Sequence, residues 1–211
     1  MKMNTEFSIR KAQTVYVVDD DSSVRKWMSR LLCSAGYEFR GFASADEFLA
    51  CECDASTSGG CLVLDVAMPG LSGMELQEAL GENSLPIIFV TGHGDISMGV
   101  SAMKKGAMDF LVKPVRGRDM LKAVEVALRK DEEVRARRVE ITEIRKRKET
   151  LTPRERAVKK LVVTGMLNKQ IAAELGIEEG TVKVHRHRVM AKMGVPSVAE
   201  LVKLCLKTPA D

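Results

Sequence analysis

Short apolar runs alternate with amphipathic segments along the first part of the chain. The apolar runs are rich in β-branched residues, which predicts strands near residues 14–18, 38–42, 61–65, 86–90 and 109–112. Between them, apolar residues recur at helical spacing near residues 23–35, 44–51, 73–80, 96–105 and 117–130. Strands that alternate with helices in this way predict an α/β fold, a doubly wound five-stranded parallel sheet in the order 2-1-3-4-5.

The pattern changes from Leu151 onward to short helices without strands. Thr152 as cap, Pro153 at the first helical position and Glu155 at the third predict one helix start. Asn168 and Ser197 could cap two further helices, and a third is expected over residues 181–193. Three glycines would end successive helices, namely Gly165, Gly176 and Gly194. A helix, a short turn and a basic helix predict a small all-α helix-turn-helix domain.

The segment 131–150 separates these two patterns. It contains neither Gly nor Pro, and opposite charges recur at a spacing of four, so it predicts a solvated helical linker. Its apolar positions are too sparse for a coiled coil. The expected organisation is a flexible N-terminus (1–12), an α/β domain (13–130), the helical linker (131–150) and the helix-turn-helix domain (151–211).

Charge is unevenly distributed along the 211 residues, although the net value is only +4. Residues 1–130 carry a net charge of −2, whereas residues 151–211 carry +5, which predicts nucleic acid as the partner of the second domain. The five cysteines show no spacing typical of zinc, which favours small core side chains in a reducing compartment. Since no run resembles a membrane span or a signal peptide, we expect a cytoplasmic protein without a membrane partner.

Chemically distinctive residues follow three of the predicted strands. Asp19 and Asp20 come after the first strand, Asp65 ends the third, and Lys113 follows the fifth. The carboxyl ends of parallel strands meet at one edge, so these groups should lie together, and their mutual repulsion favours bound Mg²⁺. Asp65 stands alone and is the best candidate for a nucleophile toward phosphorus, while Thr91 and Lys113 could bond the phosphoryl oxygens. The simpler alternative is a solvated helix start beside a surface lysine.

The motifs around these residues resemble the receiver domain of two-component response regulators over about residues 13–130. They are Val17-Val18-Asp19-Asp20-Asp21, Leu64-Asp65-Val66-Ala67-Met68-Pro69-Gly70 with Gly73, and Lys113-Pro114. The resemblance implies that Asp65 is the phospho-acceptor. It also implies that Asp20, Asp65 and the backbone carbonyl of Ala67 bind Mg²⁺, with Asp19 acting through water.

The same resemblance assigns switch roles to Thr91 and to Phe110, and it implies a cis peptide bond between Lys113 and Pro114. Ala67 stands where this family often has a polar or charged side chain. His93 occupies a second variable position, and the two residues are expected to set the lifetime of the phosphoryl group. The alternative for His93 is a solvated loop histidine.

The third helix of the tail combines an apolar spine with a cationic face. Val182, Val189 and Met193 should pack inward on Ile171, Leu175 and Leu161, which would leave the cations in position to enter the major groove. A solvated basic helix is the alternative.

Three tail motifs, Leu151-Thr152-Pro153-Arg154-Glu155, Asn168-Lys169-Gln170-Ile171-Ala172 and Gly180-Thr181-Val182-Lys183-Val184-His185, resemble the LuxR-type DNA-binding domain. The whole chain is similar to FixJ/NarL-type regulators, and its tail especially to StyR-like ones. By this resemblance His185 packs near the turn, three residues face base edges (Lys183, Val184 and His187), and three contact phosphates (Lys169, Thr181 and Lys192).

These patterns predict a transcription factor that is switched by phosphorylation of Asp65. The partners implied are a sensor histidine kinase, double-stranded DNA with two half-sites, and a second copy of the chain joined through the receiver; RNA polymerase is a further candidate. Such a receiver is not an enzyme beyond its own Mg²⁺-dependent phosphoryl transfer and autodephosphorylation. Two alternatives are a haloacid-dehalogenase-type phosphatase with Asp19 as nucleophile, and a receiver whose output binds only protein.

Overall fold

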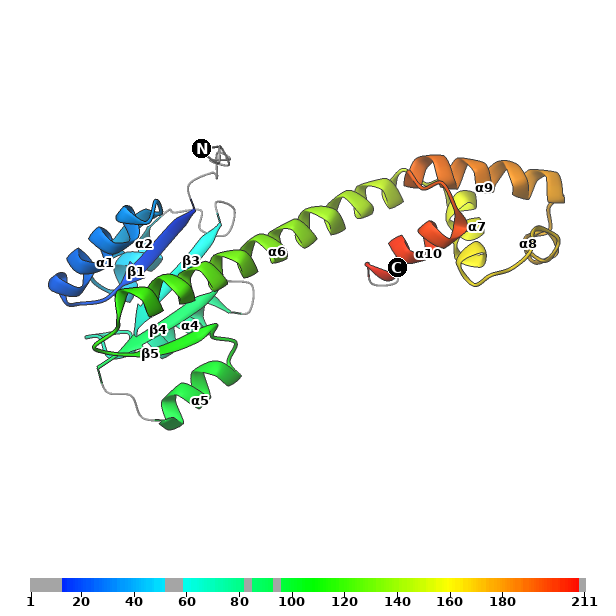
Figure 1. Cartoon of the computed structure of the whole chain (residues 1–211). Helices are drawn as coiled ribbons and strands as arrows, with labels where there is room; N and C mark the ends of the chain where they lie inside the picture. Colours follow the sequence, from blue (N-terminus) through cyan, green and yellow to red (C-terminus); the bar gives the residue numbers. More distant parts are fainter. Residues whose placement is uncertain (1–12, 52–58, 82–84, 93–95, 209–211) are drawn as a thin grey trace, which may run out of the picture. The chain divides into compact units, whose positions relative to one another are not determined.

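The computed structural model describes residues 13–51, 59–81, 85–92 and 96–208 (Figure 1). The chain divides into two compact units, one ending at Arg135 and the other beginning at Ala136. A single helix, α6 (Gly117–Glu149), contributes to both units. Across the described residues, no helix combines the length and the apolar character needed to cross a membrane.

The first unit is built on a parallel five-stranded sheet in the order β2-β1-β3-β4-β5, as predicted. Its strands are β1 (Thr14–Val18), β2 (Glu38–Phe42), β3 (Gly60–Asp65), β4 (Ile87–Thr91) and β5 (Asp109–Val112). The three central strands β1, β3 and β4 are buried along their whole length, which explains why their sequences are nearly continuous apolar runs.

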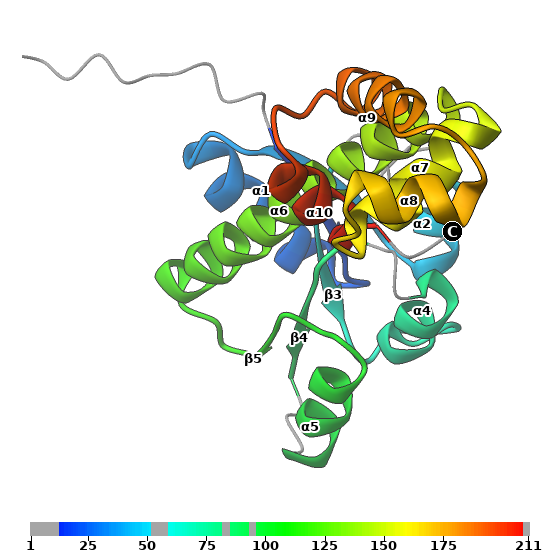
Figure 2. The ribbon, with the colours of Figure 1, turned by 90° about the vertical axis from the view of Figure 1, so that its right-hand side faces the viewer.

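Helices cover both faces of this sheet (Figures 1 and 2). Val15 and Val17 of β1 pack toward α1 (Ser22–Ser34) and the first part of α6. The alternate residues Tyr16 and Val18 pack toward α2 (Ala45–Ala50), α4 (Gly73–Leu80) and α5 (Ile96–Lys104). The sheet is therefore doubly wound, with one hydrophobic core on each face.

The cap of α1 settles a choice that the sequence left open among three neighbouring residues. Asp21 is the N-cap, and its Oδ1 accepts a hydrogen bond from the backbone N–H of Ser23 at 2.7 Å. The turn between β1 and α1 therefore consists of Asp19, Asp20 and Asp21, and it lies at the carboxyl edge of the sheet.

The second unit is entirely helical among the residues that the structure describes. Besides the end of α6 it contains α7 (Pro153–Val163), α8 (Asn168–Leu175), α9 (Glu179–Met193) and α10 (Val198–Leu206). Val182, Val189 and Met193 are buried in its core with Ile171, as the predicted spine requires. Ile144 of the predicted linker is buried in the same core, so this part of α6 packs within the second unit.

Two helix starts differ from the prediction. Helix α9 begins at Glu179, before Thr181, and Asn168 is the first residue of α8 and not its cap. The N-cap of α8 is Leu167, whose backbone N–H donates to the Gln170 side chain at 2.8 Å. The side chain of Asn168 therefore takes no part in capping α8.

The cysteine prediction holds only in part. Cys61 is fully buried in the core of the first unit, where burial raises the pKa of its thiol. Cys33 is exposed, so the expectation of a small core side chain is wrong for it. Cys51 packs against the core but is disulfide-bonded, which differs from the reduced thiol expected.

Candidate functional sites

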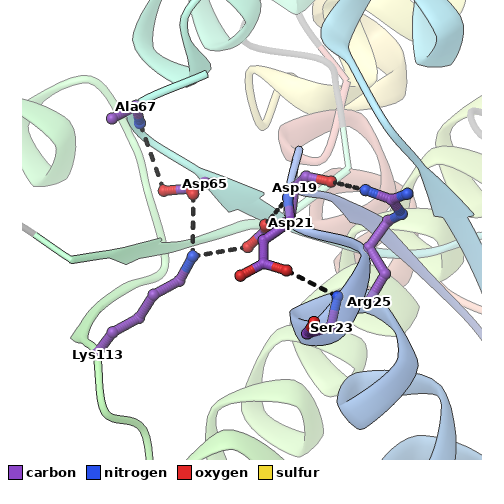
Figure 3. Close-up of polar contacts among 7 residues, drawn as sticks. All are labelled: Asp19, Asp21, Ser23, Arg25, Asp65, Ala67 and Lys113. Atoms are coloured by element: carbon purple, nitrogen blue, oxygen red, sulfur yellow. Dashed lines mark hydrogen bonds and ion pairs between the residues drawn. The ribbon is translucent and has the colours of Figure 1, made fainter. Parts of the chain in front are cut away.

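Three strand ends bring Asp19, Asp65 and Lys113 into direct contact (Figure 3). The ammonium Nζ of Lys113 lies 2.8 Å from Asp19 Oδ2 and 2.9 Å from Asp65 Oδ2. Both carboxylates are buried, with only 1% of Asp19 and 7% of Asp65 exposed. The contact follows from the topology, because β1 and β3 are neighbours in register and β5 ends at the same edge. The convergence predicted from the sequence is present.

Asp20 completes an acidic cluster with these two carboxylates. One carboxylate oxygen from each of Asp19, Asp20 and Asp65 lies within 4.8 Å of the others, and Asp20 is exposed to solvent. The backbone N–H of Ala67 lies 3.4 Å from Asp65 Oδ1, so the loop after β3 stays close to this carboxylate. A cluster of hard oxygen donors with one solvent-facing member fits the ligand preference of Mg²⁺.

Burial and ion pairing act against each other in this cluster. Burial raises the pKa of Asp19, which outweighs the hydrogen bonds from Lys113 and from the Asp21 amide that lower it. Burial alone would lower the pKa of Lys113, but its bonds to Asp19 and Asp65 together raise it. Two of the three carboxylates thus share one ammonium and Asp20 adds a further negative charge, so the cluster favours a bound cation.

The two predicted switch residues lie beside this site. Thr91 is buried at the end of β4, and its carbonyl accepts a hydrogen bond from the Lys113 backbone N–H at 2.8 Å. Phe110 on β5 is half-buried, with its ring centroid 6.4 Å from that of Phe89. The peptide bond between Lys113 and Pro114 is cis, as the resemblance implied. His93 lies outside the described residues.

Sequence reasoning missed one residue at this site. The guanidinium of Arg25, on the first turn of α1, donates from Nη1 to the backbone carbonyl of Asp19 at 2.6 Å (Figure 3). No sequence signal distinguishes this arginine from the other cations of α1, because its partner is a main-chain atom.

The second unit presents a cationic surface along α9. Lys183, Val184 and His187 are exposed on the face opposite the buried spine, and Lys169 and Thr181 are also exposed. Lys183 pairs with Glu179 of the same helix, at 3.3 Å and in solvent. These five residues are exposed to solvent, and their contact with DNA stays a prediction.

Lys192, which was predicted to contact phosphate, is bonded within the unit. Its Nζ lies 2.7 Å from Glu155 Oε2 and 3.0 Å from the carbonyl of Thr150. The bond from Lys192 is the main cause that lowers the pKa of Glu155, and the Thr152 amide adds to it. A phosphate contact by Lys192 thus remains a prediction, while the structure gives its ammonium an internal role.

A second cation of α9 also holds the helices together. Arg186 Nη1 donates to Asn168 Oδ1 at 2.6 Å and thereby joins α9 to the start of α8. The neighbouring His185 is half-buried, and its Nδ1 has no hydrogen-bond partner among the described residues. His185 is thus less exposed than its neighbour His187, and its packing near the turn stays a prediction.

Comparisons with known families match both units. Residues 15–125 match the response regulator receiver domain, and residues 149–205 match the luxR family of bacterial regulatory proteins. Nodulation protein W of Bradyrhizobium diazoefficiens is 48% identical over 192 residues, which are 90% of this chain and 84% of that protein. The response regulator protein TodT of Pseudomonas putida is 44% identical over 197 residues, covering 92% of this chain and 86% of TodT.

Solved structures agree with these sequence relationships. A low-resolution structure of the response regulator StyR is 48% identical, has a TM-score of 0.83, and covers 93% of this chain and 99% of its own. The relatives are regulators and not classical enzymes, so the phosphatase alternative finds no support. The chain belongs to the two-component response regulators that carry a LuxR-type DNA-binding domain.

Proposed function

We propose that phosphorylation of Asp65 by a sensor histidine kinase switches the binding of this regulator to DNA. The observation that carries the proposal is the contact of Lys113 with both Asp19 and Asp65 in a cluster completed by Asp20. A buried nucleophile beside an ammonium and hard oxygen donors is suited to in-line phosphoryl transfer.

In this proposal, Asp20, Asp65 and the Ala67 carbonyl would hold Mg²⁺, and Asp19 would act on it through water. The bound ion supplies positive charge to the carboxylates and to the oxygens of the incoming phosphoryl group. An oxygen of Asp65 attacks phosphorus, and the bond from phosphorus to the kinase histidine breaks as the new bond forms. Lys113 is placed to bond a phosphoryl oxygen once the aspartyl phosphate has formed.

The switch then passes from the phosphoryl group to the surface of the first unit. Thr91 moves toward the phosphate and Phe110 turns inward, which changes the surface formed by α5 and β5. That surface exposes apolar side chains, namely Met98, Val100, Met103 and Val112, which supports dimerisation through the receiver. The phosphorylated state is a shifted population of the same fold.

The DNA-binding residues we propose lie on α8 and α9. Lys183, Val184 and His187 would face base edges, while Lys169 and Thr181 would contact phosphates. Their exposure supports these roles. Dimerisation would pair two such surfaces over two half-sites of double-stranded DNA, and RNA polymerase is a further proposed partner. A cytoplasmic location is consistent with this function.

Mapping the modified residue tests the first step. The full chain is treated with acetyl phosphate and Mg²⁺, and the acyl phosphate is trapped and located by mass spectrometry. We expect the label on Asp65, with no label in Asp65→Asn. Modification at Asp19 would instead support the phosphatase alternative and contradict the proposal.

A further inference from the structure

Every polar group of Asp19 has a partner within the first unit, and the bonds to Lys113, Asp21 and Arg25 are drawn in Figure 3. Its Oδ2 accepts from Lys113 at 2.8 Å, and its Oδ1 accepts from the Asp21 backbone N–H at 2.9 Å. Its backbone N–H donates to the carbonyl of Phe42 at 3.2 Å, and its own carbonyl accepts from Arg25 at 2.6 Å. Three of these bonds hold the residue just beyond the end of β1, and the bond from Arg25 acts on the peptide that leads to Asp20.

The orientation of Asp20 depends on that peptide. The carbonyl of Asp19 and the N–H and Cα of Asp20 share one rigid plane, so a fixed carbonyl direction fixes where the Asp20 Cα lies. The bond from the Asp21 N–H to Asp19 Oδ1 closes the turn on the other side of Asp20 and restricts the remaining rotation that sets the direction of its side chain. In the part of the chain that the structure describes, no group donates a hydrogen bond to the Asp20 carboxylate. Its direction is therefore set by the backbone on which Arg25 acts.

Arg25 is itself held in place at both ends. Its backbone N–H donates to the Asp21 carbonyl at 3.1 Å in the first turn of α1. Its side-chain stem lies against β2, where a Cβ at Gly41 would be 3.7 Å from Arg25 Cδ. The guanidinium thus reaches the Asp19 carbonyl from a half-buried and anchored side chain.

We propose that Arg25 is a positioning residue for Mg²⁺, which acts through the Asp19–Asp20 peptide and not by contact with the metal. The inference rests on the proposed function, because it takes the acidic cluster as the Mg²⁺ site. Hydrogen-bond partners outside the ligand shell characteristically contribute to metal affinity by orienting the ligands.

The sign of the effect separates positioning from simple electrostatics. Arg25 carries a positive charge near the site, so removing it should strengthen the attraction for Mg²⁺ if charge were its only influence. Loss of the bond to the carbonyl should weaken Mg²⁺ binding, because Asp20 would then adopt several directions. Positioning predicts weaker binding, and charge alone predicts tighter binding.

The test compares Arg25→Met and Arg25→Lys with Arg30→Met, which removes the same charge from an exposed position on the same helix. Mg²⁺ is titrated into the full chain while the emission of Trp27, the only tryptophan, is recorded. The same dissociation constant is obtained from the Mg²⁺ dependence of Asp65 labelling by acetyl phosphate. Thermal melting in the absence of Mg²⁺ verifies that each variant is folded.

We expect Arg25→Met to bind Mg²⁺ about tenfold more weakly than the wild type, while the labelling rate at saturating Mg²⁺ is retained. Arg25→Lys, which keeps a donor and the charge, should recover part of the affinity and serves as the test if Arg25→Met does not fold. Arg30→Met should bind as tightly as the wild type or slightly tighter. Equal Mg²⁺ affinity in the Arg25 and Arg30 variants would overturn the role of Arg25 alone, whereas a wild-type chain that binds no Mg²⁺ would overturn the proposed function as well.

Discussion

Two lysines of the same helix, α9, have different structural roles. Lys183 pairs with Glu179, and 65% and 48% of these side chains are exposed. Lys192 pairs with Glu155, of whose side chain only 3% is exposed. The capping box that contains Glu155 was predictable from local sequence, but its bond to a residue 37 positions away was not, because it depends on how α7 packs against α9.

This difference predicts that the same substitution affects stability at Lys192 and DNA binding at Lys183. Lys192→Gln should lower the free energy of unfolding of the second unit by about 1–3 kcal/mol, since it leaves a buried carboxylate without its cation; solvent access to Lys192 argues for the lower part of that range. Lys183→Gln should leave stability within about 0.5 kcal/mol and weaken DNA binding. Calorimetry measures the stability of each variant, and a DNA titration measures its affinity for DNA. A Lys192 variant with normal stability and weak DNA binding would show that the phosphate role is its main one.

The same ion pair predicts a dependence of stability on pH. The pKa of Glu155 is lowered from its usual 4.5, chiefly by the bond from Lys192, so the folded unit binds this proton less tightly than the unfolded chain. Its contribution is present above pH 4.5 and is lost as the pH falls through the lower pKa of the folded state. As the pH is lowered below 4.5, the melting temperature of the wild type should therefore fall more steeply than that of Glu155→Gln. An equal fall of the melting temperature in both proteins would contradict a stabilising ion pair between Glu155 and Lys192.

Among the elements, α6 contributes buried residues to the cores of both units. Val124 and Leu128 are buried in the first unit and Ile144 in the second. Asp131, at the limit of the predicted receiver, accepts a hydrogen bond from the Gly60 N–H at the start of β3, at 3.0 Å. This bond attaches the helix to the edge of the sheet opposite the acidic cluster.

Removal of the Asp131 carboxylate should destabilise the first unit. Asp131→Ala leaves the N–H of the buried Gly60 without its acceptor, which costs about 1–3 kcal/mol. Asp131→Asn retains an acceptor oxygen and should recover most of the loss. Amide hydrogen exchange at Gly60 should be faster in the alanine variant and unchanged in Glu132→Ala, an exposed neighbour. If Gly60 exchanged at the same rate in Asp131→Ala as in the wild type, the bond would have no role in stability.

The accuracy of the sequence predictions differs between elements and contacts. The strands were predicted to within one residue, because buried parallel strands are continuous apolar runs bounded by turn residues. The convergence of Asp19, Asp65 and Lys113 followed from strand order alone. The bonds of Arg25, Arg186 and Asp131 were missed, because they join residues 6, 18 and 71 positions apart through packing that leaves no local pattern.

At the scale of the whole molecule, the two units divide the chemistry between them. The net charge is −2 over residues 1–130 and +5 over residues 151–211, in keeping with an acidic aspartate cluster in one unit and a LuxR-type DNA-binding domain in the other. If phosphorylation favours a receiver dimer, two DNA-binding surfaces become linked. Their joint affinity then rises through effective concentration without any new contact to DNA.

Genome-wide DNA binding with and without phosphorylation tests this account most directly. Purified wild-type chain and Asp65→Asn are each incubated with fragmented genomic DNA, in the presence or absence of acetyl phosphate and Mg²⁺, and the bound fragments are sequenced. The account predicts that phosphorylated wild-type protein enriches a defined set of fragments with paired half-sites, and that Asp65→Asn does not under either condition. Equal enrichment of the same fragments by the untreated wild-type protein, or by Asp65→Asn treated with acetyl phosphate, would contradict a switch at Asp65.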